Sequence, residues 1–345
     1  MKRTFLRRAQ FAALALAVAC GARASAEPSY HLANTLRLGG EGSWDYAAFD
    51  PSGDRLFLTR VGGVQVVDSK TGATLGSVPA TAGTRVHGIA LATDLGLGLV
   101  GEGNDRSVSV FDLKTLELKH RIALGHSIDS VAYDTASHHA FAFAGDDGVA
   151  FVIDPSSGKV VGQIALGGSA EAAAPDGAGR LFVNLSDKAE IAVIDTAKLQ
   201  VSARWPLGKD CEDPTPITLD PGHARLVSGC RSGIAVVMDV RSGKRIAAVP
   251  IGKGADSAMF DGGVGLAFIG CNDGSIAAIR TDGDKATVAQ TIKTQPGGRI
   301  IALDPATHRL FVPLADLGPV LPKTEDTPSR PAIVPETFRI LTIEP

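Results

Sequence analysis

The sequence predicts an all-β protein, a closed seven-bladed β-propeller built from four-stranded blades. Residues 126–167 hold four short apolar runs, and a turn marker recurs seven times at steps of 42, 42, 42, 44, 41 and 43 residues. A repeat of about 40–45 residues that contains four strands has the length of one propeller blade. After residue 26, no segment sustains a helical period over three turns.

The segment 126–167 shows one complete blade. Its apolar runs are strand-length, and Asp, Gly, Pro and Ser residues separate them: Ile128–Tyr133, Ala140–Ala144, Val149–Ile153 and Val160–Leu166. Runs of this kind, bounded by turn-forming residues, are typical of antiparallel strands in a meander. We therefore expect four strands joined by tight turns.

The same plan repeats along the chain. The turn that follows the first strand of each unit is marked by Asp50, Ala92, Asp134, Asp176, Asp220, Asp261 and Asp304. A second strand follows each marker, from Leu56–Thr59 in the first unit to Leu310–Leu314 in the last. Divided by seven, residues 27–345 give about 45 residues per unit, so we expect a single repeat domain.

The two ends of the chain predict how the ring closes. Residues 36–39 resemble the end of a fourth strand, but no first three strands precede them. The last unit has three strands, around 299–303, 310–314 and 337–343, and lacks a fourth. We expect the N-terminal strand to complete the last blade, which leaves no open blade edge. The Pro-rich insertion 315–336 is expected to be a loop or flap without regular structure.

Residues 1–26 have the pattern of a cleaved signal peptide. A basic start, an apolar stretch from Phe11 to Ala19 and the small-residue site Ala24-Ser25-Ala26 follow one another. We expect a Sec-type signal and export to the periplasm or secretion. Processing as a lipoprotein at Cys20 is the alternative.

The expected mature chain is acidic. Without residues 1–26 it keeps 29 basic residues against 37 acidic ones, a formal net charge of −8. This charge disfavours nucleic acid, and no run of Lys or Arg supplies a basic stripe. Two Trp and three Tyr make a poor stacking platform for single-stranded DNA. No later apolar run approaches the roughly 20 residues of a membrane span, so we expect a soluble protein, and a monomer.

Polar residues recur five positions before each marker, where the inner strand of a blade leaves its loop: Asp45, His87, Asp129, Glu171, Thr215, Asp256 and Arg299. The repeat predicts that they form a ring at one mouth of the channel, with Trp44, Arg85, His126, Glu212 and Asp213 in the adjoining loops. Such a ring suits a cation, a polar small molecule or a basic peptide segment. The alternative is a solvent-filled mouth in which Arg299 pairs with Asp45 or Asp256.

Three cysteines remain after the leader. Cys211 precedes a first strand and Cys230 ends the second strand of the same hairpin, so a disulfide between them is the first choice. For Cys271 three states stay open: a buried inert thiol, an alternative disulfide partner, or a soft-metal ligand with His87 and the acids.

The chain resembles the YVTN/YncE-type family of exported bacterial seven-bladed propellers, which are WD40-like in architecture. The likeness rests on residues 43–46 (Ser-Trp-Asp-Tyr), 86–90 (Val-His-Gly-Ile-Ala), 193–196 (Val-Ile-Asp-Thr), 211–215 (Cys-Glu-Asp-Pro-Thr) and 335–341 (Pro-Glu-Thr-Phe-Arg-Ile-Leu). It spans essentially the whole mature chain. The resemblance implies the propeller fold and one of several binding roles, nucleic acid among them.

Together these features favour a non-catalytic periplasmic binding or interaction propeller, with a small molecule, a cation or a protein partner at the channel mouth. Motifs of common hydrolases and nucleotide-binding loops are absent. The alternatives are a metal-assisted hydrolase or lactonase, which would use a divalent ion to activate water, and a single-stranded DNA binder.

Overall fold

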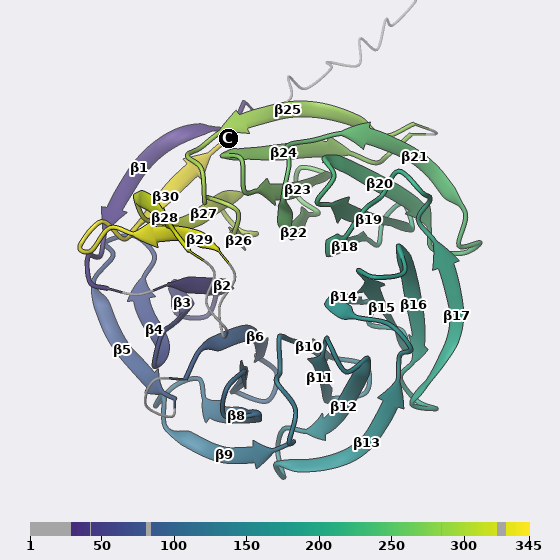
Figure 1. Cartoon of the computed structure of the whole chain (residues 1–345), viewed down its shortest axis with the longest axis horizontal. Coiled ribbons are helices and arrows are strands. Elements are labelled where there is room, and N and C mark those ends of the chain that lie inside the picture. The colour runs from purple at the N-terminus through teal and green to yellow at the C-terminus, as the bar shows by residue number, and fades with distance from the viewer. Residues whose placement is uncertain (1–28, 42, 81–83, 284, 323–328) are drawn as a thin grey trace, which may run out of the picture.

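The ring predicted from the repeat is present. The computed structural model describes residues 29–41, 43–80, 84–283, 285–322 and 329–345. Its strands form seven four-stranded sheets around a central channel, which confirms the seven-bladed propeller (Figure 1). The expected leader, residues 1–26, lies outside the described residues. Within those residues, no helix is long and apolar enough to cross a membrane.

The first six blades are meanders whose strands follow the chain outward from the channel. Blade 1 contains β2 (Trp44–Asp50), β3 (Arg55–Arg60), β4 (Gly63–Asp68) and β5 (Thr74–Pro79). Blade 2 contains β6 (Val86–Ala92), β7 (Leu97–Glu102), β8 (Ser107–Asp112) and β9 (Leu118–Ala123). Blade 3 contains β10 (Ser130–Asp134), β11 (His139–Ala144), β12 (Val149–Asp154) and β13 (Lys159–Ala165).

The next three blades repeat this order. Blade 4 contains β14 (Ala170–Pro175), β15 (Arg180–Leu185), β16 (Glu190–Asp195) and β17 (Gln200–Pro206). Blade 5 contains β18 (Pro214–Asp220), β19 (Arg225–Cys230), β20 (Ile234–Asp239) and β21 (Arg245–Pro250). Blade 6 contains β22 (Ala255–Asp261), β23 (Leu266–Cys271), β24 (Ser275–Arg280) and β25 (Thr287–Lys293).

Blade 7 joins the two ends of the chain. Its inner strands are β26 (Ala302–Asp304), β27 (Arg309–Leu314) and β30 (Arg339–Glu344), and its outer strand is the N-terminal β1 (His31–Arg37). Strand β1 runs antiparallel to β30, with Leu36 opposite Ile340. The prediction that the N-terminal strand completes the last blade is confirmed.

The Asp markers are structural. Asp50, Asp134, Asp220 and Asp261 are at most 1% exposed, although each has a carboxyl side chain. The Asp50 carboxylate accepts hydrogen bonds from the backbone N–H and the hydroxyl of Ser52, at 3.0 and 2.7 Å. A short acidic side chain at this position closes the turn on its own backbone, which explains why the marker recurs.

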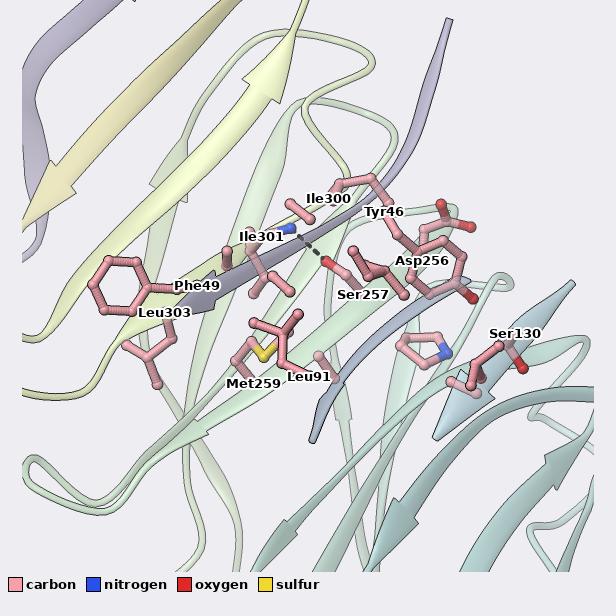
Figure 2. Close-up of a pocket in the computed structure, with 18 of the residues that line it drawn as sticks. Tyr46, Phe49, Leu91, Ser130, Asp256, Ser257, Met259, Ile300, Ile301 and Leu303 are labelled. Carbon is pink, nitrogen blue, oxygen red and sulfur yellow. Dashed lines mark hydrogen bonds between the residues drawn. The ribbon is translucent and has the colours of Figure 1, made fainter. Parts of the chain in front are cut away.

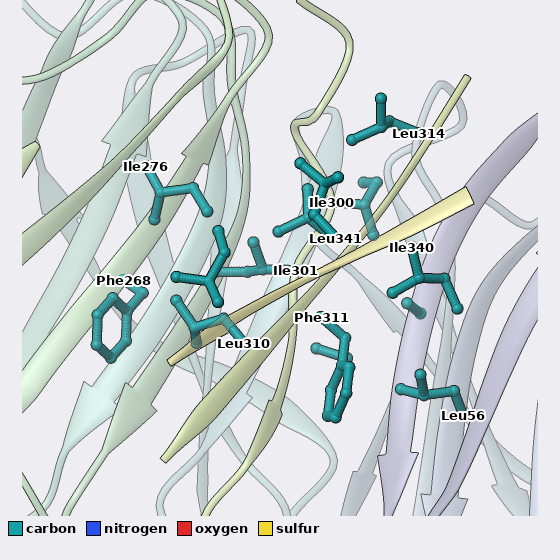
Figure 3. Close-up of a cluster of buried hydrophobic side chains, with 14 of the residues drawn as sticks. Leu56, Phe268, Ile276, Ile300, Ile301, Leu310, Phe311, Leu314, Ile340 and Leu341 are labelled. Atoms are coloured by element: carbon teal, nitrogen blue, oxygen red, sulfur yellow. The ribbon is translucent and has the colours of Figure 1, made fainter. Parts of the chain in front are cut away.

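The core lies between the blades, where their faces stack. Figure 3 shows the cluster that spans blades 6, 7 and 1, with Phe268 on one side, Phe311 in the middle, and Ile340 and Leu56 on the other side. All four side chains are at most 2% exposed. Since this cluster joins the first and last blades, it stabilises the closed ring.

The insertion in blade 7 differs from its prediction. Within 315–336, β28 (Leu317–Leu321) and β29 (Arg330–Ile333) form a two-stranded antiparallel sheet, where a loop without regular structure was expected. The prolines favoured the loop interpretation. In a two-stranded sheet, however, each strand has a free edge, where the missing proline N–H costs no ladder hydrogen bond.

The disulfide between Cys211 and Cys230 is confirmed, with its Cα atoms 5.2 Å apart. It ties the loop before β18 to the end of β19, at the rim of the channel that carries the polar ring. Cys271 is a free, buried thiol, and burial raises its pKa to about 12. The inert-thiol alternative for Cys271 therefore fits the structure.

Candidate functional site

Hydrogen bonds between neighbouring inner strands fix the backbone of the polar ring. The Ser130 hydroxyl donates to the carbonyl of Glu171, and the Ser257 hydroxyl donates to the carbonyl of Arg299, both at 2.6 Å. Each bond joins two consecutive blades, 3 to 4 and 6 to 7. The backbone at these two ring positions is therefore held by the scaffold itself.

Four ring residues from blades 1, 2, 6 and 7 form one charged network. His87 Nδ1 lies 2.6 Å from Asp45 Oδ2. Arg299 Nε donates to Asp256 Oδ2 at 2.5 Å, and its Nη2 reaches Asp45 Oδ1 at 3.5 Å. Arg299 thus bridges both of the acids that the sequence placed opposite it. Burial alone would raise the pKa of the Asp45 carboxyl. The hydrogen bond to His87 and the charges of His87, Arg299 and Arg85 outweigh this effect, so the pKa of Asp45 is lowered.

Arg231 belongs to the same network, although sequence analysis did not single it out. Its Nη2 donates to Asp256 Oδ1 at 2.7 Å, and its Nε lies 3.7 Å from Asp213. The Asp256 carboxylate therefore holds two guanidinium groups. Its position in the repeat could have identified Arg231, because the residue directly follows β19, at the rim where Cys211 and Cys230 meet.

Tyr46 is the second residue that sequence analysis missed. Figure 2 shows its ring beside Asp256 at one end of the channel lining. Burial, together with the negative charges of the ring acids, holds the pKa of the Tyr46 phenol well above its usual value. The phenol therefore stays neutral among the carboxylates. An aromatic residue one position after a ring acid is the pattern that could have identified it.

Asp129 and Glu171 occupy the side of the ring formed by blades 3 and 4. Burial raises the pKa of Glu171 to about 7, helped by the nearby charge of Asp213 and opposed by Arg231. Burial also raises the pKa of Asp129, whose Oδ2 accepts the Gly145 N–H at 3.2 Å. These two carboxyl groups therefore hold protons more readily than Asp45 does.

Below the ring, the channel itself is mainly apolar. The channel cavity encloses about 380 Å³ and is lined by residues of all seven inner strands or the loops that lead into them. Figure 2 shows Tyr46 and Asp256 at one end and Phe49 and Leu303 at the other. Of the ring residues, Asp256 alone lines this cavity.

Above the ring lies a second cavity, here called the mouth cavity, of about 730 Å³. The β28–β29 hairpin contributes Leu317, Leu321 and residues 329–333, and the propeller contributes Trp44, Arg85, Arg231 and Arg299. Arg330 and Glu41 complete the charged part of the lining. Because Asp45 and Asp256 are not in this lining, the ring presents guanidinium groups upward and keeps those two carboxylates behind them.

The predicted site residues therefore do not all lie in one cavity. Trp44, Arg85 and Arg299 line the mouth cavity, whereas Glu212 is exposed and lines neither cavity. Thr215 is 6% exposed, and its hydroxyl donates to the carbonyl of Asp213 at 3.3 Å. The expected cation or basic peptide would therefore meet arginines in the mouth cavity.

Metal-ligating side chains do not gather in the described ranges: no three His, Cys, Asp or Glu residues there are close enough together to hold an ion. Cys271 is hydrogen-bonded at 3.7 Å to the carbonyl of Ile269, in its own strand β23. The imidazole of His87 is instead engaged with Asp45.

Comparison with known proteins identifies the fold alone. No protein-family model matches the chain, and no curated protein matches its sequence. Among solved structures, a chain from the "Crystal Structure of Mitotic Checkpoint Complex" superposes with a TM-score of 0.71 at 13% identity, covering 96% of this chain and 99% of that one. At this identity the likeness supports the seven-bladed propeller and carries no statement about ligand or activity.

The raised pKa of Glu171 predicts a pH-dependent stability. The folded chain holds this proton up to about pH 7, whereas an unfolded glutamate, with its pKa near 4.5, releases it earlier. Between these values the folded state binds more protons, so its stability falls as pH rises. With partial exposure discounted, we expect a loss of about 2 kcal/mol. When the free energy of unfolding is measured in urea at several pH values, the Glu171→Gln variant should not show this decrease with pH.

The control for this prediction is Glu117→Gln, on an exposed turn, which should leave the pH slope of the parent unchanged. At pH 8 the Glu171→Gln variant should be more stable than the parent. A Glu171→Gln variant with the parent slope would show that Glu171 ionises as freely as a solvated carboxylate.

Proposed function

We propose that this chain is an exported, non-catalytic binding propeller of the YVTN/YncE type, with its ligand site in the mouth cavity. The observation that carries the proposal is the cavity of about 730 Å³ between the charged ring and the β28–β29 hairpin. Its size lies within the range of small-molecule sites. Residues from several blades meet there under a segment that the described parts of the other six blades lack.

The hairpin is tied to the propeller, which supports a built site. The Val334 N–H donates to the carbonyl of Asp316 at 2.9 Å and closes the base of the insertion. Arg339, at the start of β30, donates to the Asp316 carboxylate at 2.7 Å. A roof fixed at its base preorganises the cavity and reduces the entropy lost on binding.

The test is a native mass spectrum of the protein purified from its exported fraction, combined with a thermal-shift screen of small molecules. The variant Ala332→Trp places an indole in the cavity lining, and Ala197→Trp places one on an exposed turn as the control. We expect a bound small molecule, or a stabilising hit, in the parent and in Ala197→Trp but not in Ala332→Trp. A ligand that survives Ala332→Trp, or the lack of any ligand in both assays, would contradict the proposal.

A hydrolase is the second candidate, favoured by the Asp45–His87 pair. The carboxylate orients the imidazole through Nδ1, and the described residues offer no partner to Nε2. A Cβ at Gly103 would lie 2.8 Å from Nε2, so the glycine leaves that nitrogen accessible. An imidazole oriented in this way can act as a general base toward water. Ester or lactone hydrolysis, with or without a divalent ion, that His87→Ala abolishes would favour this candidate.

A further inference from the structure

The mouth cavity has two chemically different walls. Its floor carries the guanidinium groups of Arg85, Arg231 and Arg299, from blades 2, 5 and 7. Its roof, the hairpin, contributes Leu317 and Leu321, which are 39% and 48% exposed despite their size. A molecule that complements both walls has an apolar body and an end rich in hydrogen-bond acceptors.

Two residues that line this cavity each have a buried donor with no acceptor among the described residues. One is the indole Nε1 of Trp44, a residue only 5% exposed, and the other is the buried Nε of Arg85. The backbone of Arg85 is fixed, because it bridges to Val61 and its carbonyl accepts the Gly103 N–H at 3.1 Å. A buried donor without a partner is costly, so an acceptor supplied by a ligand would be favourable here.

The charges of the floor limit the ligand to about one negative charge. Arg231 and Arg299 already pair with the Asp256 carboxylate. Within the described part of the chain, no ion pair involves Arg85. Since Asp45 is already engaged by His87 and Arg299, the Arg85 guanidinium remains available to a further anion. The other two charged residues of the lining, Arg330 and Glu41, have opposite signs, so the uncompensated charge of the cavity is about one positive charge. A monoanion matches this charge better than a phosphate dianion does.

We propose that the mouth cavity binds a monoanionic organic acid, with its carboxylate between Arg85 and Trp44 and its apolar body against Leu317 and Leu321. This assignment rests on the proposed function and names its ligand class. A carboxylate has two acceptor oxygens, which serve the guanidinium and the indole N–H together. The hairpin roof covers the hydrocarbon part.

Isothermal titration with matched probes tests the assignment. The probe is 3-phenylpropanoate, compared with 3-phenylpropanol, 3-phenylpropylamine, acetate and phenyl phosphate. We expect 3-phenylpropanoate to bind at least about tenfold more tightly than the alcohol, because the charge-assisted hydrogen bonds are lost in the alcohol. Acetate, which lacks the apolar body, and phenyl phosphate, which adds charge, should both bind more weakly.

Three variants locate the interaction. Arg85→Gln and Trp44→Phe should each weaken binding of 3-phenylpropanoate, the first by about tenfold, and leave binding of the alcohol unchanged. Arg241→Gln, on an exposed turn, is the matched control and should bind as the parent does. Trp44→Phe keeps an aromatic ring against Phe338, so it tests the N–H with little change in packing.

The outcomes separate this inference from the proposed function. An alcohol or amine that binds as tightly as the carboxylate, and is lost in Ala332→Trp, keeps the cavity as a site and overturns the carboxylate assignment. Unchanged carboxylate binding in both Arg85→Gln and Trp44→Phe also overturns it. Phenyl phosphate as the tightest probe would replace the carboxylate with a phosphate ester. No binding by any probe or native ligand would overturn both proposals.

Discussion

Deletion of residues up to Arg37, which removes β1, is expected to lower the free energy of unfolding by on the order of 5 kcal/mol and to promote aggregation. The deletion takes away Tyr30 and Leu36, which are 3% and 6% exposed, and a full row of backbone pairs to β30. Burial of two large side chains contributes about 1.5–3 kcal/mol each, and the lost hydrogen bonds add to this. The exposed β30 edge would then be free to pair with other chains.

The effect is large because β1 and Tyr30, which directly precedes it, together contact three blades. Beyond its pairing in blade 7, the backbone N–H and carbonyl of Tyr30 bond to the Gln290 amide in blade 6, at 2.9 and 2.7 Å. Toward blade 1, a Cβ at Gly72 would lie 3.1 Å from Leu36 Cβ, which shows how closely the two approach. Chemical denaturation followed by circular dichroism, with light scattering, measures the loss.

Two substitutions of the same type in the same strand provide the control. Leu36 points into the closing core, whereas Leu32 is 55% exposed. We expect Leu36→Ala to cost about 3 kcal/mol and Leu32→Ala less than about 1 kcal/mol. Equal costs at the two positions would mean that β1 contributes backbone pairing alone and that its buried side chains do not secure the ring.

The fold could be predicted because its signals are local and repeated. Each Asp marker closes a turn on its own backbone, as Asp50 does with Ser52, so the same residue type returns at blade spacing. The missing fourth strand at the C-terminal end and the spare strand at the N-terminal end predicted the closure at β1. The Cys211–Cys230 disulfide was also predictable, since the repeat places both residues at one rim.

The candidate site was only partly predictable. The repeat identifies the blade and rim of a residue, but it gives no information on which way the side chain points along the channel axis. Asp256 and Arg299 have the same place in the repeat, yet Asp256 lines the channel cavity and Arg299 lines the mouth cavity. Tyr46 and Arg231 lie outside the sevenfold pattern of ring positions. Side-chain direction depends on the packing and ion pairs of the folded ring, which sequence periodicity does not encode.

Asp256→Asn is expected to lower the free energy of unfolding by about 3 kcal/mol. The Asp256 carboxylate is 11% exposed and holds Arg231 at 2.7 Å and Arg299 at 2.5 Å. Removal of one partner from a buried ion pair typically costs 3–5 kcal/mol, and the lower end applies because the Arg231 side chain is 48% exposed. Denaturation in urea at pH 7 measures the change.

The matched control for Asp256→Asn is Asp54→Asn. Asp54 lies 2.5 Å from Lys70, a distance as short as that between Asp256 and Arg299, but both side chains of this pair are exposed. Since solvent screens such pairs, we expect a change of less than about 1 kcal/mol. Similar effects for the two variants would contradict the view that the ring is a desolvated charged network.

Asp256→Asn also tests whether the mouth cavity carries a positive charge that attracts an anion. Asp256→Asn removes a negative charge and leaves both guanidinium groups in place, so the floor becomes more positive. We expect 3-phenylpropanoate to bind several-fold more tightly to Asp256→Asn while the stability of the unliganded protein falls. General loosening of the fold would lower both quantities together, so opposite changes would show that the arginines over Asp256 attract the anion. A parallel loss of stability and affinity would instead mean that Asp256 is needed to hold the arginines in position.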